Sequence, residues 1–442
     1  MGNASDEVKR RASFTTTSFE EEGFANAVES IILPRAVPAS GPASKPTGRL
    51  HHVGQSLWLD NITRELVEGG TLERYIRELS VTGLTSNPTI FEHAIETSPA
   101  YDASIIQRAQ RGMTPEEAFF EIALEDITRA ADLFRPIHDR TAGIDGWVSL
   151  EVSPLLARDP TETLAAAKSL FARASRPNLM IKIPGTRECL PAIEEAIFQG
   201  IPINVTLLFS REQYLAAAEA FLRGTERRIE AGLSPNVSSV ASIFVSRWDT
   251  AIAQTAPVEL KWRLGIAMAK RTYKAYRDLL RAPRWQRVYN AGGRPQRLLW
   301  ASTGTKDPAG SDVMYVKALT AQFTVVTVPE KTLLALGDHG DITSLLRADG
   351  GDCEQGLAAF TAAGIDLYAL AERLQEEGTE SFVHSWNGLM EVIASKAAAL
   401  SRERARGVSG PGGGRPVRVP RRDTGGGGWA IRGRSPRALR SR

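Results

Sequence analysis

A lysine interrupts one of the most apolar segments of this 442-residue chain, LMIKIP at residues 179–184. If the segment is a strand, Lys182 and Met180 face one way and the branched residues between them face the other. Lysine is rarely buried alone, because desolvation of its charge is unfavourable. An amine among apolar groups has its pKa lowered from ~10.4 and can then attack a ketone carbonyl. The segment therefore favours Schiff-base chemistry, which requires no metal ion.

Two carboxylates in other apolar segments would face the same way as Lys182, toward the interior. Asp60 ends SLWLD, and Glu151 lies inside WVSLEVS between two residues that would face outward. An inward Asp60 could act as general base on a substrate hydroxyl, and Glu151 could handle the water exchanged during imine formation. The alternative is a buried Lys–Glu salt bridge without a catalytic role.

Amide and hydroxyl side chains recur at the same end of further strands. In PINVTLL the alternation sends Asn204 and Thr206 inward and leaves Leu207 facing the helices. Asn87 closes the second segment, Ser242 lies in the sixth and Ser302 closes the seventh. One such residue alone would be an ordinary turn cap. Polar groups from seven strands at one end are unusual, because a purely structural barrel interior holds branched apolar side chains. Their types suit a polyhydroxylated sugar.

Eight short, β-branched segments alternate with longer helical ones, which is typical of βαβ units and a parallel sheet. Their number predicts an α/β fold of the TIM-type (β/α)₈ barrel class, whose reactive mouth lies at the carboxyl ends of the strands. The predicted strands are Ser56–Asp60, Val81–Asn87, Trp147–Ser153, Leu179–Pro184, Ile201–Leu208, Ser238–Phe244, Arg297–Ser302 and Phe323–Val328.

The intervening helices carry start signals. Ser210 and Gln213 form a capping box before a helix over 211–230, and Pro160 opens a helix that ends at Ala174. A last helix over Ser381–Leu400 has apolar residues on one face, so we expect it to pack across an end of the barrel.

The two ends of the chain differ from its centre. We expect a mostly disordered extension over residues 1–50, the barrel over 51–400, and a disordered Arg/Gly-rich tail over 401–442. The tail holds 12 arginines and two acidic residues, so residues 1–400 carry a net charge of −7 within the total of +3. The body is therefore not expected to bind nucleic acid, although the tail could contact a polyanion.

Composition excludes several other classes of protein. The 42% hydrophobic and 24% charged fractions are those of a globular chain, and no apolar run is long enough to span a membrane. The start of the chain lacks the apolar core of a signal peptide. Cys189 and Cys353 belong to no CxxC motif or His cluster, so we expect a cytoplasmic protein without a metal site or cofactor.

Six segments that occur in order between about residues 51 and 400 resemble the transaldolase family. They are LWLDNITRELVEGGTL, GLTSNPTIF, VSLEVSP, MIKIPGT, PINVTLLFS and SIFVSR. The resemblance implies that Lys182 forms the Schiff base and that Asp60 is the acid/base for carbon–carbon cleavage. It also implies that a catalytic water is held by Glu151 and Thr206, and that the hydroxyls of a dihydroxyacetone unit are bound by Asn87, Asn204 and Ser242.

The family's phosphate pocket is similar to Arg247 together with Ser302. Some members carry arginine two residues after that serine, whereas this chain has Gly304. We expect Lys306 to supply the second cation, the alternative being a solvated loop lysine.

The reaction that the resemblance implies uses sugar phosphates of the non-oxidative pentose phosphate pathway. A ketose phosphate (fructose 6-phosphate or sedoheptulose 7-phosphate) would give its three-carbon unit to an aldose phosphate, erythrose 4-phosphate or glyceraldehyde 3-phosphate. One alternative is a fructose 6-phosphate aldolase, which releases the unit instead. Another is an inactive barrel that acts as a scaffold with a polyanion-binding tail. The sequence does not indicate the oligomeric state.

Overall fold

The computed structural model describes residues 9–10 and 45–408. The predicted extensions over 1–50 and 401–442 therefore lie largely outside the described residues. Helix α3 (Pro46–His52) begins before residue 51, and the last helix continues past residue 400. In the described part of the chain, no helix is both long enough and apolar enough to cross a membrane.

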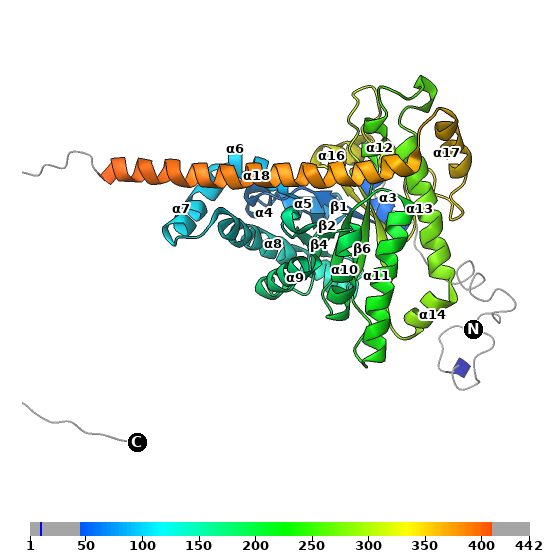
Figure 1. The fold of residues 1–442 in the computed structure, drawn as a ribbon, viewed down its shortest axis with the longest axis horizontal. Helices are drawn as coiled ribbons and strands as arrows, with labels where there is room; N and C mark the ends of the chain where they lie inside the picture. Colours follow the sequence, from blue (N-terminus) through cyan, green and yellow to red (C-terminus); the bar gives the residue numbers. More distant parts are fainter. Residues whose placement is uncertain (1–8, 11–44, 409–442) are drawn as a thin grey trace, which may run out of the picture.

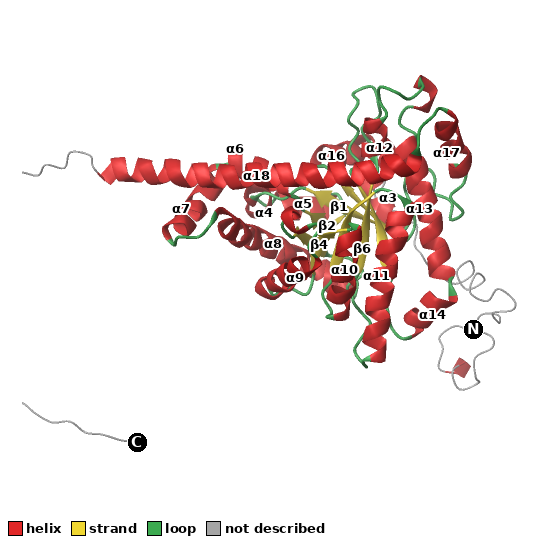
Figure 2. Ribbon diagram, in the orientation of Figure 1, coloured by secondary structure: helices red, strands yellow, loops and turns green. Residues whose placement is uncertain are grey.

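Eight parallel strands close into a barrel in chain order, with β8 pairing to β1. Figure 2 shows the strands at the centre, with helices around them. The predicted (β/α)₈ fold is thus confirmed, and each predicted strand matches an observed one with small differences at the ends. The strands are β1 Gln55–Asp60, β2 Val81–Thr85, β3 Trp147–Glu151, β4 Leu179–Pro184, β5 Ile203–Leu208, β6 Ser239–Phe244, β7 Gln296–Ala301 and β8 Thr324–Val328.

Some of the helices that surround the barrel begin at a residue whose side chain caps the helix. Ser210 and Gln213 make the predicted capping box of α11, with the Ser210 Oγ accepting from the Gln213 N–H at 3.2 Å. The α-helices that follow β1 are α4 Arg64–Glu68, α5 Thr71–Glu78, α6 Pro88–Thr97, α7 Asp102–Gln110, α8 Pro115–Arg140, α9 Pro160–Ala174, α10 Leu190–Phe198, α11 Arg211–Glu230, α12 Ser246–Ala251, α13 Leu264–Arg281, α14 Pro283–Asn290, α15 Met314–Ala318, α16 Glu330–His339, α17 Cys353–Ala362 and α18 Leu367–Val408.

Alternate residues of the strands divide between two apolar clusters, as the period of two requires. The outer cluster, between strands and helices, includes Leu57, Ile181, Val205 and Ala241. The second cluster extends from the inside of the barrel to helices such as α12 and α18, and it includes Trp58, Met180, Val240 and Leu299. Leu207 does not join Val205 in the outer cluster, because it lies in the second cluster beside Gly378 of α18. Its φ of 58° and a register shift after Val205 break the alternation there.

Helix α18 lies across the mouth of the barrel and extends past α6 and α7 (Figure 1). The predicted crossing is confirmed, but the predicted start at Ser381 is wrong, because the helix begins at Leu367. Gly378 lies within it, and a Cβ there would come within 3.0 Å of Leu207 Cδ2. The glycine therefore allows close approach to the barrel. Nearby, Gln375 Nε2 donates to the Leu207 carbonyl at 2.9 Å and to the Gly185 carbonyl at 3.2 Å.

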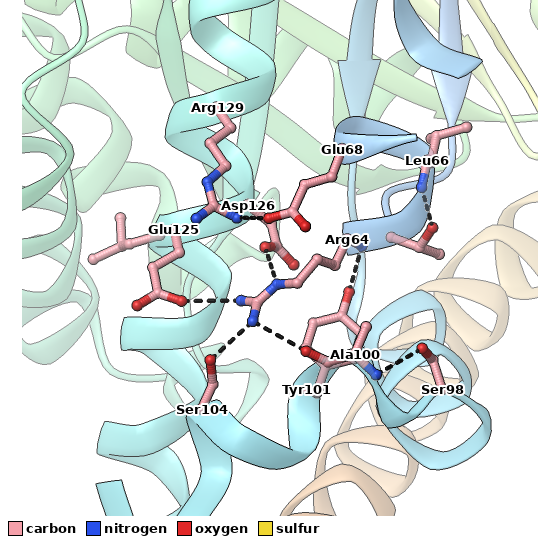
Figure 3. A network of polar contacts seen from close by, with 12 residues as sticks. Arg64, Leu66, Glu68, Ser98, Ala100, Tyr101, Ser104, Glu125, Asp126 and Arg129 are labelled. Carbon is pink, nitrogen blue, oxygen red and sulfur yellow. Dashed lines mark hydrogen bonds and ion pairs between the residues drawn. The ribbon is translucent and has the colours of Figure 1, made fainter. Parts of the chain in front are cut away.

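A buried polar network fixes the segment that follows β1 (Figure 3). Arg64, at the start of α4, donates to Asp126 Oδ1 at 3.0 Å and to Glu125 Oε2 at 2.9 Å, both on α8. It also donates to Ser104 Oγ of α7 at 2.8 Å, and its backbone N–H donates to the Tyr101 hydroxyl at 2.8 Å. One guanidinium thus joins α7 and α8 to the chain that leaves the first strand.

Replacement of Arg64 by methionine is expected to destabilise the fold by about 3 kcal/mol or more, because Asp126 would stay buried without its cation. Burial already raises the pKa of Asp126, and Arg64 opposes that shift. Urea unfolding would measure the effect, with the exposed Arg77→Met as the matched control. A double variant with Asp126→Leu should recover most of the loss. Equal stability of Arg64→Met and Arg77→Met would contradict this account.

Candidate active site

Lys182 lies on β4 at the mouth of the barrel and is only 5% exposed. The strand register places it beside Glu151 of β3, and its Nζ donates to Glu151 Oε2 at 2.8 Å. The same nitrogen donates to the Ser86 carbonyl at 3.2 Å and lies 5.4 Å from the centroid of the Phe382 ring. The amine is therefore held by two acceptors and lies near an aromatic ring of α18.

Two buried oxygens near the amine have no hydrogen-bond partner among the described residues, Glu151 Oε1 and Thr206 Oγ1. Burial raises the pKa of Glu151, and the charge of Asp60 adds to the increase, while Lys182 opposes it. A buried polar atom without a partner is unfavourable unless a water or a ligand satisfies it. Glu151 and Thr206 are thus suited to hold a small polar molecule.

Asp60 lies on the cavity wall at the end of β1. The Thr85 hydroxyl donates to Asp60 Oδ1 at 3.0 Å and lies 3.2 Å from the Thr327 hydroxyl. Burial raises the pKa of Asp60, whereas the positive charges of Lys182 and Lys306 lower it. A carboxylate with a raised pKa is a stronger base, which suits proton transfer to and from a substrate.

A row of polar side chains inside the barrel connects β6, β5 and β3. The Ser242 hydroxyl donates to Asn204 Oδ1 at 2.7 Å, and Asn204 Nδ2 donates to the Ser149 hydroxyl at 3.0 Å. These bonds fix the orientation of the Asn204 amide. Asn87 follows β2 and caps α6, where its Oδ1 accepts from the Ile90 N–H at 3.0 Å.

Cationic and hydroxyl groups gather on the side of the mouth formed after β6 and β7. The Arg247 guanidinium lies 5.5 Å from the Phe244 ring and 6.0 Å from the Phe382 ring, and burial lowers its pKa. Ser302 follows β7 with a φ of 54°, and its hydroxyl lies 2.9 Å from that of Ser246. Such a partly desolvated guanidinium is well suited to bind an anion.

One cavity of about 260 Å³ brings these groups together. Eight of the ten sequence-predicted site residues line it: Lys182, Asp60, Thr206, Asn87, Ser242, Arg247, Ser302 and Lys306. The other two lie directly behind the wall, with Glu151 bonded to Lys182 and Asn204 bonded to Ser242. Within the described ranges, no group of three or more His, Cys, Asp or Glu side chains could hold a metal ion.

A family model described as transaldolase/fructose-6-phosphate aldolase matches residues 57–393. The chain belongs to this family. It is 44% identical to a transaldolase of Thermobifida fusca, over 80% of this chain and 99% of that protein. It is 42% identical to a transaldolase of Acidothermus cellulolyticus, over 82% of this chain and 99% of that protein. It is 43% identical to transaldolase 2 of Streptomyces coelicolor, over 80% of this chain and 97% of that protein.

At Gly304 this family member has little room for a side chain. A Cβ at Gly304 would lie 3.1 Å from Pro329 Cγ, so a larger residue would require that proline to shift. Lys306, two residues later, lines the cavity instead.

The sequence analysis missed several residues around the cavity. Thr85 lies on an inward position of β2, in phase with Asn87, so strand alternation could have found it. Ser149 of β3 is also in phase with Glu151, and it holds Asn204. Phe382 lies on the apolar face of the last predicted helix, which the sequence places against an end of the barrel but not at the Lys182 amine. Strand phase carries no signal for it, because α18 reaches the mouth from outside the sheet.

Proposed function

We propose that this protein is a transaldolase that moves a dihydroxyacetone unit between sugar phosphates through a Schiff base on Lys182. The observation that carries the proposal is the position of Lys182 Nζ, 2.8 Å from Glu151 and on the wall of a polar cavity. The match over nearly the full length of three transaldolases supports the same reaction.

The first step joins Lys182 to the substrate. The unprotonated amine adds to the C2 carbonyl of a ketose phosphate, and the carbinolamine loses water to give an iminium. Glu151 accepts a proton from the amine and supplies one to the departing hydroxyl. The buried Glu151 Oε1 and Thr206 Oγ1 hold the water that leaves and later returns.

The second step breaks the bond between C3 and C4. Asp60 removes the proton of the C4 hydroxyl, the C4 oxygen forms a carbonyl, and the electrons of the broken bond pass to the iminium, which becomes an enamine. An aldose phosphate leaves. The enamine then attacks an incoming aldose phosphate, Asp60 returns the proton, and hydrolysis releases the new ketose. The hydroxyls of the retained unit bind to Asn87, Asn204 and Ser242.

The substrate phosphate binds to Arg247, Ser302 and Lys306, which line the same side of the cavity. Replacement of Lys306 by glutamine is expected to lower kcat/KM for fructose 6-phosphate by about 10- to 100-fold, mainly through KM, because one charged hydrogen bond to the phosphate is lost. Steady-state kinetics would measure it, with the exposed Lys331→Gln as control. An unchanged KM in Lys306→Gln, beside a raised KM in Arg247→Gln, would mark Lys306 as a solvated loop residue.

Transfer and simple cleavage differ in their need for an acceptor. A transaldolase releases glyceraldehyde 3-phosphate from fructose 6-phosphate continuously only when erythrose 4-phosphate is supplied. An aldolase would release it without an acceptor, and an inactive scaffold would not release it at all. A coupled assay with and without erythrose 4-phosphate therefore tests the proposal, and sustained release without an acceptor would overturn it.

We further propose that the reaction belongs to the non-oxidative pentose phosphate pathway in the cytoplasm. The two cysteines support this compartment, because Cys189 and Cys353 are both free thiols and both buried. Free thiols are usual in reducing compartments. Fractionation of the native cells would test the location.

A further inference from the structure

A second, larger cavity of about 700 Å³ lies at the opposite end of the barrel. Its lining includes Ser239 at the start of β6 and Phe323 just before β8. It therefore opens at the amino ends of the strands, away from the Lys182 mouth. Its floor is formed by Met180 and Val240, which face into the barrel two residues before Lys182 and Ser242.

The walls of this lower cavity are apolar and aromatic. Trp147, Met180 and Val240 form a buried surface at its base. Around the rim, Ile144, Tyr289 and Phe323 are 57%, 60% and 58% exposed, which is unusual for side chains of this size. These rim residues therefore form an apolar surface open to solvent.

The Phe323 backbone is strained at this rim. Its φ of 59° is left-handed, and its N–H donates to the Gly54 carbonyl at 2.9 Å. A bulky residue in this conformation costs free energy, and such strain is concentrated at sites that bind something.

Two arginines give the cavity a positive charge. Among the described residues that line it, none is an aspartate or a glutamate. Arg297 donates to Ser56 Oγ and to the Ile144 carbonyl, each at 2.8 Å, and lies 3.9 Å from the Asp145 carboxylate. Within the described part of the chain, the Arg294 side chain has neither an ion-pair nor a hydrogen-bond partner. An anion at this rim could therefore bind to the Arg294 guanidinium, beside an Arg297 guanidinium that is already held by other bonds.

We propose that this lower cavity binds a flat, amphipathic aromatic anion. Its ring would lie against Trp147 and Tyr289, and its carboxylate, sulfonate or phosphate would bind to Arg294. The volume falls within the range of small-ligand sites, which are mostly apolar with a few placed polar groups. The mostly apolar lining suits an aromatic ring better than the polyhydroxylated sugars expected at the mouth. This site is independent of the proposed transaldolase reaction.

The test is a fluorescence titration of the full chain with 8-anilinonaphthalene-1-sulfonate, an aromatic sulfonate that brightens in apolar sites. Saturating fructose 6-phosphate is present to occupy the mouth. Arg294→Glu and Tyr289→Ala should each raise the Kd by about tenfold or more, because each removes one of the two contacts. The matched controls are Arg111→Glu and Tyr368→Ala, two exposed residues elsewhere, which should leave the Kd unchanged.

The outcomes separate this inference from its alternatives. An equal Kd in all four variants would overturn it, as would probe binding that is seen only when fructose 6-phosphate is left out, which would place the probe in the mouth. The inference would also be overturned if the wild-type protein is a dimer that does not bind the probe and Tyr289→Ala makes it a monomer. In that case a second copy of the chain covers the surface. All four variants should keep wild-type turnover, so failure here would leave the proposed reaction untouched.

Discussion

Replacement of Lys182 by methionine is expected to lower kcat by more than about 10⁴-fold, because among the described residues it is the amine that lines the cavity and bonds to Glu151. The nucleophile that forms the covalent intermediate would be missing, and binding groups alone do not substitute for it. Steady-state assays of fructose 6-phosphate with erythrose 4-phosphate would measure the loss. The exposed helix residue Lys168 provides a matched control, since Lys168→Met removes a lysine away from the mouth and should retain full activity.

The Lys182→Met change also leaves Glu151 buried without its cation, which would destabilise the fold. Burial raises the pKa of Glu151, so this carboxyl can take up a proton and limit the damage. The double variant Lys182→Met/Glu151→Gln removes the uncompensated charge. It should regain stability in urea unfolding and remain inactive. Activity in the double variant would contradict a Schiff base on Lys182.

Replacement of Asp60 by asparagine is expected to lower kcat by about 10²- to 10⁴-fold, the usual contribution of a general acid/base. Asparagine keeps the size of the side chain but does not take up the proton of the C4 hydroxyl. Imine formation uses Lys182 and Glu151, so the Schiff base should still form in this variant. Borohydride trapping of Asp60→Asn with fructose 6-phosphate should therefore label the protein while turnover is lost. A variant with normal turnover would remove Asp60 from the mechanism.

The dependence of kcat on pH should also report the ionisation of Asp60. Burial raises the pKa of Asp60, and a general base must be ionised, so activity is lost as the pH falls through this raised value. The acidic limb of the wild-type kcat profile should lie above pH ~4, the pKa of a solvated aspartate. The residual activity of Asp60→Asn should lack that limb. Thr85→Val, which removes the hydrogen bond to Asp60, should move the limb to higher pH, because that bond lowers the pKa.

The barrel and most of its mouth could be predicted from strand phase. Each strand has two faces, so the position of Lys182 between Ile181 and Ile183 was enough to turn it inward. The parallel register then brought Glu151 and Asn204 to the same level on either side of it. These are local rules applied to each strand separately, and they succeed because a closed barrel aligns the carboxyl ends of all strands.

Features that depend on contacts between distant segments could not be predicted in this way. The alternation fails at Leu207, where a left-handed residue turns the chain toward α18. The start of α18 at Leu367, by contrast, has a local signal that the sequence analysis overlooked, because Asp366 Oδ1 accepts from the Tyr368 and Ala369 N–H groups, each at 3.0 Å. Phe382 reaches the Lys182 amine because α18 crosses the mouth, which strand alternation does not predict. The lower cavity likewise combines loops that precede separate strands.

The most direct test of the central claim is borohydride reduction in the presence of fructose 6-phosphate, followed by peptide mass mapping. Reduction of the imine fixes the sugar carbons on the lysine that formed it. The account predicts one adduct, dependent on fructose 6-phosphate, on the peptide that contains Lys182. Active enzyme that forms no adduct, or forms it on another lysine, would contradict the account.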